Sequence, residues 1–216
     1  MSEQLPLTLP HRVAMGVEDF LVADCNAAAV GWVDRWPDWP GPALVVYGPP
    51  GCGKTHLAHL WRSRSGAAFL PARLLGQGDT LALLGGGLRC VLEAADAGVD
   101  ELALLQLYNL LREAGGSMLL TARLPPHRWG LALADLSSRL IAAPAAAISW
   151  PDDGLIEALI QKLFADRQLA VPSEVMAFLT RRIERSFEAA RRIVAAVDAA
   201  SLASGRPVTL SLVRGV

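Results

Sequence analysis

The chain has 216 residues, 52% of them hydrophobic and 19% charged, with 20 Lys and Arg against 21 Asp and Glu. This length and apolar content exclude a disordered chain and predict one domain, or a core domain with a small second one. The net charge of −1 gives no general electrostatic reason to bind nucleic acid, so we expect no direct sequence-specific DNA binding.

Patterns typical of strands and of helices alternate through the first 150 residues. After an extended leader, a helix is predicted over 26–36, where Pro37 ends it. Short apolar runs predict strands at 43–47, 67–72, 88–92, 117–122 and 145–149, and helical patterns predict helices at 54–64, 100–115 and 133–140. Parallel neighbours need crossover connections, so this alternation predicts a parallel sheet with its ligand site at the carboxyl ends of the strands.

Strand patterns largely stop after residue 150. Helices are predicted over 152–168, 173–183 and 186–204, and the segment 206–216 predicts either a strand or a short helix. We therefore divide the chain into a leader (1–16), an α/β core (17–150) and an α-helical part (151–216).

The sequence shows no sign of export or of a membrane span. No apolar run reaches the roughly 18 residues that a span needs, and the first ten residues lack the features of a signal peptide. The three cysteines, Cys25, Cys52 and Cys90, have no C-x-x-C spacing. Free thiols in a reducing compartment are expected, and with them a cytoplasmic protein without membrane contact.

The strongest motif is GPPGCGKT at 48–55, which follows an apolar strand, precedes a helix and matches the phosphate-binding P-loop. Gly51 and Gly53 let the backbone turn its N–H groups toward phosphate oxygens. Lys54 offers a cation to the β- and γ-phosphates, and the Thr55 hydroxyl offers a ligand to Mg²⁺. We predict that ADP or ATP binds with Mg²⁺ at Gly48, Pro49, Pro50, Gly51, Cys52, Gly53, Lys54, Thr55 and His56.

Four stretches follow in the order found in the AAA+ module of the bacterial replication initiator DnaA: GPPGCGKTHL, DELALLQLYNLL, LLTARLPP and LADLSSRL. Over nearly its whole length the chain resembles most the shorter Hda-like, DnaA-homologous regulators. The 216 residues leave no room for the initiator's helix-turn-helix domain, which favours a regulator. The resemblance implies a P-loop AAA+ α/β core with a small C-terminal helical lid. It also implies an adaptor that binds the DNA sliding clamp, promotes ATP hydrolysis by DnaA and self-associates as a homodimer or higher oligomer.

The leader contains QLPLTLP at 4–10, an extended segment with a leading Gln4 and apolar residues at Leu5, Leu7 and Leu9. Extended apolar segments of this kind are bound in pockets of partner proteins. This one resembles the hexapeptide by which bacterial proteins bind the β sliding clamp. The alternative is an ordinary leader strand or tail.

Several positions depart from the resembled family's catalytic pattern. Glu93 stands where an Asp holds Mg²⁺, and Ala94 stands where a second acid positions water, with Asp96 as a poor substitute. The polar γ-phosphate sensor falls near Thr121 to Arg123, where an arginine stands in place of the usual acid. The lid's phosphate-sensing arginine aligns best with Glu188, and Arg185, Arg191 and Arg192 nearby are the alternatives. We therefore expect the chain to hold a nucleotide, ADP foremost, and to hydrolyse ATP slowly or not at all.

Arg139 in LSSRL matches the family's arginine finger, which acts on a nucleotide bound by the neighbouring subunit. The alternative is a surface arginine at a helix end. Two other functions stay open: a small P-loop kinase, or an active ATPase of helicase-loader type that acts on a helicase or on single-stranded DNA.

Three groups of side chains carry weaker signals. His56 and His59 are not joined by an acid or a thiol, which disfavours a metal site. One tryptophan of a cluster could flank the adenine, while core packing is expected of the others: Trp32, Trp36 and Trp39. The last helices carry a basic patch that forms either a solvated face or a contact with phosphates or an acidic partner: Arg181, Arg182, Arg185, Arg191 and Arg192.

Overall fold

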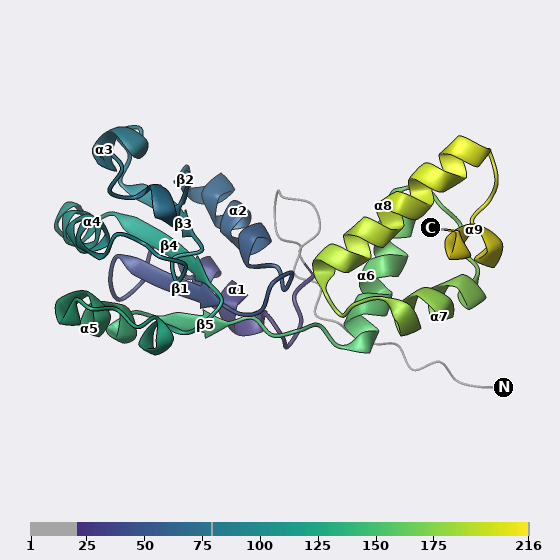
Figure 1. Ribbon diagram of the computed structural model, residues 1–216, viewed down its shortest axis with the longest axis horizontal. Helices are drawn as coiled ribbons and strands as arrows, with labels where there is room; N and C mark the ends of the chain where they lie inside the picture. The colour runs from purple at the N-terminus through teal and green to yellow at the C-terminus, as the bar shows by residue number, and fades with distance from the viewer. Residues whose placement is uncertain (1–20, 79, 216) are drawn as a thin grey trace.

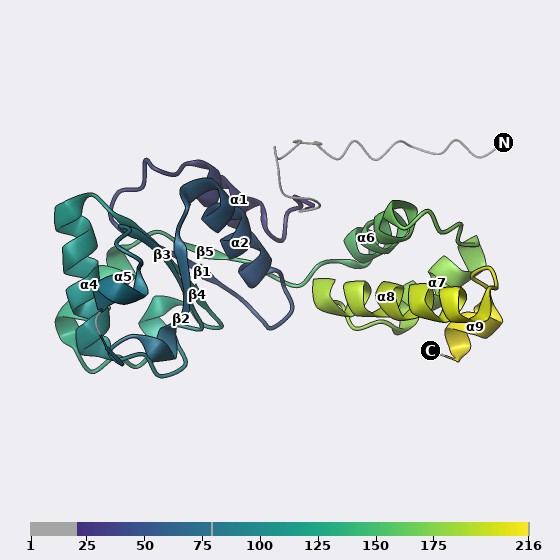
Figure 2. The same ribbon diagram turned by 90° about the horizontal axis from the view of Figure 1, so that it is seen from above.

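The computed structural model describes residues 21–78 and 80–215 of the chain. These residues form an α/β core and a separate group of helices, which lie side by side along the longest axis of the molecule (Figures 1 and 2). No helix within the described ranges is long and apolar enough to cross a membrane.

The core contains one parallel sheet with the strand order β2-β3-β4-β1-β5. Its strands are β1 (Ala43–Tyr47), β2 (Ala68–Pro71), β3 (Arg89–Glu93), β4 (Ser117–Ala122) and β5 (Ala145–Ala147). Because every pair is parallel, all carboxyl ends meet at one edge of the sheet. Residues that directly follow β1 and β3 therefore lie near each other, although some 45 residues separate them.

Helices cover both faces of this sheet. One face packs against α1 (Ala27–Asp34) and α2 (Lys54–Ser65), and the other against α4 (Glu101–Ala114) and α5 (Ala134–Ala142). Leu44 and Val46 of β1 contribute to the first cluster, and Val45 between them contributes to the second. Burial on both faces explains why the strands are continuous apolar runs without a polar alternation.

The tryptophans before β1 pack in the core with Trp61 of α2. The fully buried Trp61 ring stacks on Trp39 at 5.4 Å between centroids and meets Trp36 edge-on at 6.0 Å. The Trp36 indole donates to Ser117 Oγ, and the Trp39 indole donates to the carbonyl of Trp32. Core packing therefore accounts for Trp36 and Trp39, and with both indoles engaged here neither supports the adenine-flanking alternative.

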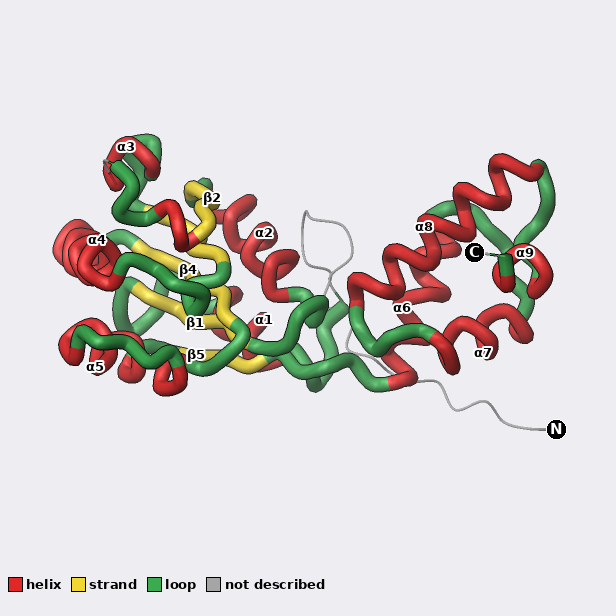
Figure 3. Tube along the Cα trace, viewed as in Figure 1, coloured by secondary structure: helices red, strands yellow, loops and turns green. Residues whose placement is uncertain are grey.

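Within the described residues, the C-terminal part contains helices joined by loops and no strand (Figure 3). It consists of α6 (Asp153–Asp166), α7 (Ser173–Arg182), α8 (Phe187–Ser204) and α9 (Leu210–Arg214). These helices bury an apolar cluster of their own, which includes Ile160, Phe164 and Val194. The segment 206–216, for which the sequence predicts either a strand or a short helix, contains the short helix α9. A short helix that the sequence patterns do not predict, α3 (Thr80–Leu83), precedes β3.

We predict that Asp100→Ala lowers the free energy of unfolding by about 1 kcal/mol. Asp100 is the N-cap of α4, and its carboxylate accepts from the Ala103 N–H at 2.9 Å. Chemical denaturation of the two purified proteins measures the difference. Asp38→Ala is the matched control, because it removes the same carboxylate from an exposed position outside the helices. Equal losses in both variants would show that the cap does not stabilise α4.

Candidate functional site

The P-loop (residues 48–55) leaves the carboxyl end of β1 and leads directly into α2. Gly48, Gly51 and Gly53 have φ angles of 154°, 72° and 101°, which side-chain-bearing residues rarely adopt. A Cβ at Gly48 would lie 2.0 Å from the Ile148 carbonyl oxygen, so a side chain cannot be placed there without moving the backbone. The glycines therefore build a loop whose amides and helix N-terminus can surround an anion.

The Lys54 side chain folds back over the P-loop. Its Nζ donates to the carbonyls of Gly48 and Pro49, both at 2.7 Å, which fixes the ammonium group over the loop. Cys52 is fully buried under the loop, and burial raises the pKa of its thiol. Cys52 thus packs through its side chain and can offer a ligand only its backbone. Pro50 is exposed at the outside of the turn.

Thr55 and Glu93 meet at the carboxyl edge of the sheet. The Thr55 hydroxyl donates to Glu93 Oε1 at 2.7 Å. Glu93 is the last residue of β3, and Thr55 is in the first turn of α2, so the shared sheet edge brings them together. A hydroxyl next to a carboxylate is the oxygen donor set that Mg²⁺ uses beside nucleotide phosphates. Among the described residues no group of three or more His, Cys, Asp or Glu could hold a metal without a nucleotide.

The segment after Glu93 does not supply a second acid to this edge. Ala94 has a φ of 57° and donates its N–H to the Thr121 hydroxyl at 3.2 Å. Asp96 is occupied elsewhere, because its carboxylate accepts from the N–H groups of Arg123 and Leu124 at 2.8 and 3.0 Å. Asp96 thus holds the loop after β4 in place, which disfavours it as a substitute for the missing acid.

The helical part contacts the P-loop through the first turns of α8. The Phe187 N–H donates to the Gly51 carbonyl at 3.2 Å, and a Cβ at Gly51 would lie 3.0 Å from Ser186 Cβ. A cavity of about 320 Å³ opens between the loop and this helix. Its lining includes Lys54 and Thr55 on one side and Glu188 on the other.

His56 and Arg191 face each other across the same cavity. Both Nη atoms of Arg191 lie close to His56 Nδ1, at 3.3 and 3.4 Å. Burial, then the charges of Arg191 and His59, lowers the pKa of His56 to about 4, so this imidazole is neutral at pH 7. His59 stacks on Phe69 at 4.5 Å between ring centroids. Neither histidine belongs to a metal cluster within the described residues.

The arginines of the predicted basic patch do not act as one surface. Arg185 is paired with Asp153, with Nη2 and Oδ2 2.9 Å apart, and Arg182 lies over the ring of Phe178. Arg191 alone among the five lines the cavity at the P-loop. The sequence leaves Arg185, Arg191 and Arg192 as alternatives near Glu188, and the docking of α8 places Arg191 on this side.

Arg139 lies at the opposite edge of the sheet. It lines a hollow with Pro40, Gly41 and Pro144, residues that precede the amino ends of β1 and β5. In Figure 1, α5 lies at the end of the core away from the helical part. Because the P-loop follows the carboxyl end of β1, Arg139 does not face the chain's own P-loop.

Three neighbours hold the Arg139 guanidinium. Nε and Nη2 donate to the two carboxylate oxygens of Asp135 at 2.8 and 2.9 Å, and Nη1 donates to Asn109 Oδ1 at 2.9 Å. The ring of Tyr108 lies 5.6 Å from the guanidinium carbon. The ion pair raises the pKa of Arg139 and lowers the pKa of Asp135. The spacing of four residues between Asp135 and Arg139 is visible in the sequence, whereas the contact with Asn109 of α4 is not.

The expected clamp-binding residues lie outside the described residues. This applies to Gln4, Leu5, Leu7 and Leu9.

Comparisons with known proteins agree with this architecture. Residues 152–216 match the family model of the Hda lid domain. Domain III of the Thermotoga maritima replication initiation protein DnaA superposes with a TM-score of 0.73 at 16% identity, over 90% of this chain and 91% of that chain.

More distant solved structures share the fold over a part of their length. AMPPCP-bound DnaA from Aquifex aeolicus gives a TM-score of 0.68 at 15% identity, over 82% of this chain and 63% of that chain. The Thermotoga maritima Holliday junction branch migration motor RuvB gives 0.63 at 18% identity, over 88% and 65%. At these identities the likeness shows the fold. The chain is thus similar to the Hda lid over residues 152–216 and shares the fold of DnaA domain III over most of its length.

Proposed function

We propose that the protein is a nucleotide-binding AAA+ adaptor that binds the DNA sliding clamp and promotes ATP hydrolysis by the initiator DnaA, so that it down-regulates initiation. One observation carries this proposal: a fully built phosphate loop stands beside an incomplete hydrolytic site, while an arginine is presented at the opposite edge of the sheet. The Hda lid match and the DnaA-like fold support it.

The P-loop residues fit a nucleoside di- or triphosphate, since a Cβ at Gly48 or Gly51 would fill the space around the loop. Lys54 would hold the β-phosphate, and the N-terminus of α2 would face it. Thr55 and Glu93 would hold Mg²⁺, which neutralises phosphate charge when it is bound. The Aquifex aeolicus DnaA structure solved with AMPPCP supports this assignment for the shared fold.

The same geometry supports weak hydrolysis by the chain itself. Ala94 cannot polarise water, and the Asp96 carboxylate is engaged by two backbone N–H groups. Thr121 is buried and accepts from the Ala94 N–H through its hydroxyl, which ties it to the backbone of this segment. The chain would therefore keep its nucleotide as a structural ligand, with ADP as the favoured species.

Arg139 would act on a neighbour. An arginine directed at another subunit's phosphates stabilises transition-state charge there. Its place at the amino edge of the sheet, away from the chain's own P-loop, supports such a role in trans. Ile141, two residues further along the same helix, is 54% exposed, so an apolar side chain of α5 is available for contact with DnaA or with a second copy of the chain.

We predict that Lys54→Ala weakens ADP binding by well over tenfold, about 1.4 kcal/mol or more, because it removes the main cation from the phosphates. Isothermal titration calorimetry with Mg-ADP measures this. Arg62→Ala is the matched control, since it removes a charge from an exposed position of the same helix. Equal ADP affinity in Lys54→Ala and the parent protein would contradict the P-loop assignment.

A second prediction concerns the leader. Joint replacement of Gln4, Leu5 and Leu7 by alanine should abolish binding to the purified sliding clamp and leave thermal unfolding unchanged. Glu3→Ala, just outside the motif, should bind as the parent does. A pull-down with immobilised clamp compares the three proteins, and full retention by the triple variant would remove the motif from the proposal.

A third prediction separates the two sites. Arg139→Ala should abolish stimulation of DnaA ATP hydrolysis by the clamp-bound protein, and leave its ADP and clamp binding intact. Stability should change little, because the Asp135 partner is 56% exposed. Ala94→Asp should change only the protein's own turnover, and Asp tolerates the left-handed backbone at this position.

The rate of phosphate release, measured for each variant with and without DnaA, tests both expectations. If the protein alone hydrolyses ATP rapidly and Arg139→Ala abolishes this activity, the result would contradict the adaptor proposal and favour a self-assembling AAA+ enzyme.

A further inference from the structure

Glu101, in the first turn of α4, holds the chain at the start of α5. Its two carboxylate oxygens accept from the N–H groups of Ala132 and Leu133, at 3.0 and 2.7 Å. Leu133 is the N-cap of α5, and its apolar side chain cannot accept the hydrogen bond that a capping residue usually accepts. Glu101 therefore binds the N-cap N–H from a neighbouring helix, as the glutamate of a capping box does within one helix.

The helix that Glu101 holds is the one that carries Arg139. The guanidinium is tied to Asp135, in the first turn of α5 itself, and to Asn109 of α4. α4 and α5 lie side by side (Figures 1 and 2). The direction of the guanidinium thus depends on how α5 is placed against α4.

Glu101 gives α5 an attachment that does not involve Arg139. Leu136 and Leu140 are buried in the core cluster and keep α5 on the sheet, but apolar packing has little directional preference. The directional contacts to α4 are the hydrogen bonds at Asn109 and at Glu101. The first acts through the arginine side chain, whereas the second acts on the backbone where α5 begins.

A fixed position matters because Arg139 can act without leaving its present partners. Its hydrogen bonds to Asp135 and Asn109 use three of the five guanidinium N–H groups, and two are left for phosphate oxygens. Misplacement of a catalytic group by about 1 Å can cost roughly 100-fold in rate. A small shift of α5 would therefore weaken the action of Arg139 on a neighbour's nucleotide.

We propose that Glu101 is a positioning residue for Arg139. It fixes the start of α5 against α4, and through α5 it directs the guanidinium toward the nucleotide of the neighbouring subunit. Glu101 acts on the backbone of this chain and touches no phosphate. The inference rests on the proposed action of Arg139 on DnaA.

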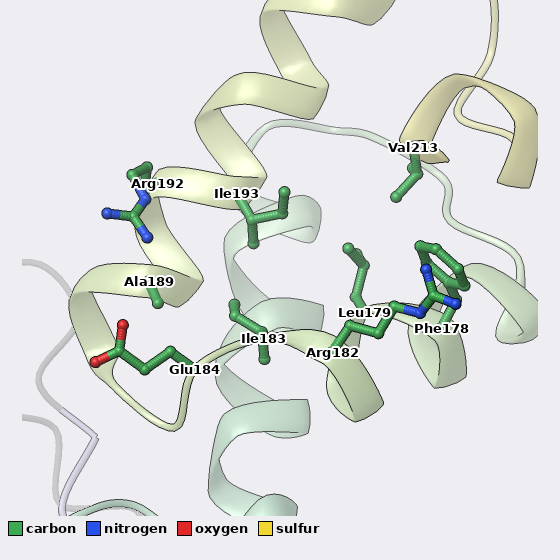
Figure 4. Close-up of a pocket in the computed structure, with 9 residues that line it drawn as sticks. All are labelled: Phe178, Leu179, Arg182, Ile183, Glu184, Ala189, Arg192, Ile193 and Val213. Atoms are coloured by element: carbon green, nitrogen blue, oxygen red, sulfur yellow. The ribbon is translucent and has the colours of Figure 1, made fainter. Parts of the chain in front are cut away.

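Glu184 provides a control for Glu101. It is exposed in the loop between α7 and α8, where it lines a hollow of the lid together with Arg182 and Arg192 (Figure 4). Replacement of either glutamate by alanine removes one negative charge, and only Glu101 holds α5.

The test uses full-length parent protein, Glu101→Ala, Glu184→Ala and Arg139→Ala. Each protein, bound to the clamp, is titrated to saturation against a fixed amount of ATP-bound DnaA, and phosphate release is measured. A loss of folded protein raises the concentration that gives half-maximal stimulation, but leaves the maximal rate unchanged. A misdirected Arg139 lowers the maximal rate and leaves the half-maximal concentration unchanged.

We expect the maximal rate with Glu101→Ala to be lower by about fivefold or more, and that with Glu184→Ala to stay within about twofold of the parent. A smaller reduction with Glu101→Ala, a change in its half-maximal concentration alone, or an equal reduction with Glu184→Ala overturns the inference. If thermal unfolding shows that Glu101→Ala does not fold, Glu101→Gln replaces it. Its amide oxygen can still accept one of the two N–H groups, so its maximal rate should lie between those of the parent and Arg139→Ala; a parent-like rate overturns the inference.

Arg139→Ala separates this inference from the proposed function. Loss of stimulation in Arg139→Ala with parent-like stimulation in Glu101→Ala removes the positioning role and leaves the adaptor proposal standing. Parent-like stimulation in Arg139→Ala contradicts the proposed action of Arg139 itself, and the positioning role with it.

Discussion

The contact between the P-loop and the first turn of α8 is the constraint on which the rest of the site depends. Gly51 is the point of closest approach, because its carbonyl accepts from the Phe187 N–H and its missing Cβ leaves room for Ser186. Ser186 in turn caps α8 through the Ala189 N–H. One glycine thus serves both the loop and the lid. A larger residue there would separate the two parts of the phosphate cavity as well as strain the loop.

The P-loop and Arg139 lie at opposite edges of the parallel sheet. At the carboxyl edge, β1 and β3 bring together a phosphate loop, a hydroxyl and a carboxylate. At the amino edge, the turns before β1 and β5 border Arg139, which α4 and α5 hold in a fixed position. The polarity of the strands therefore places Arg139 away from the chain's own P-loop. This separation is the reason why we propose that Arg139 acts on a neighbouring subunit.

The sequence predicts the sheet well, because its strands are buried on both faces and read as unbroken apolar runs. The strands at 43–47 and 117–122 have the predicted bounds. β5 ends two residues earlier than predicted, since the Ser149 N–H donates to the Cys25 carbonyl instead of continuing the ladder. The four-residue helix α3 has too few residues for a helical period to show. The P-loop can be predicted from the sequence without knowledge of tertiary contacts, because the residues of its motif are consecutive.

The contacts of the lid could not be predicted in this way. Five arginines near the start of α8 look alike in the sequence, and alignment with a related family favours an acid, Glu188. Which arginine faces the P-loop depends on how α8 docks, and this docking involves the Gly51 contact and the apolar cluster under the helix. The physical consequence concerns the balance of charge. Glu188 places a negative charge in the cavity beside the P-loop, and Arg191, one turn further along α8, places a positive charge there without forming an ion pair with it. The lid thus places a cation beside the P-loop one turn beyond the position that the family's alignment favours.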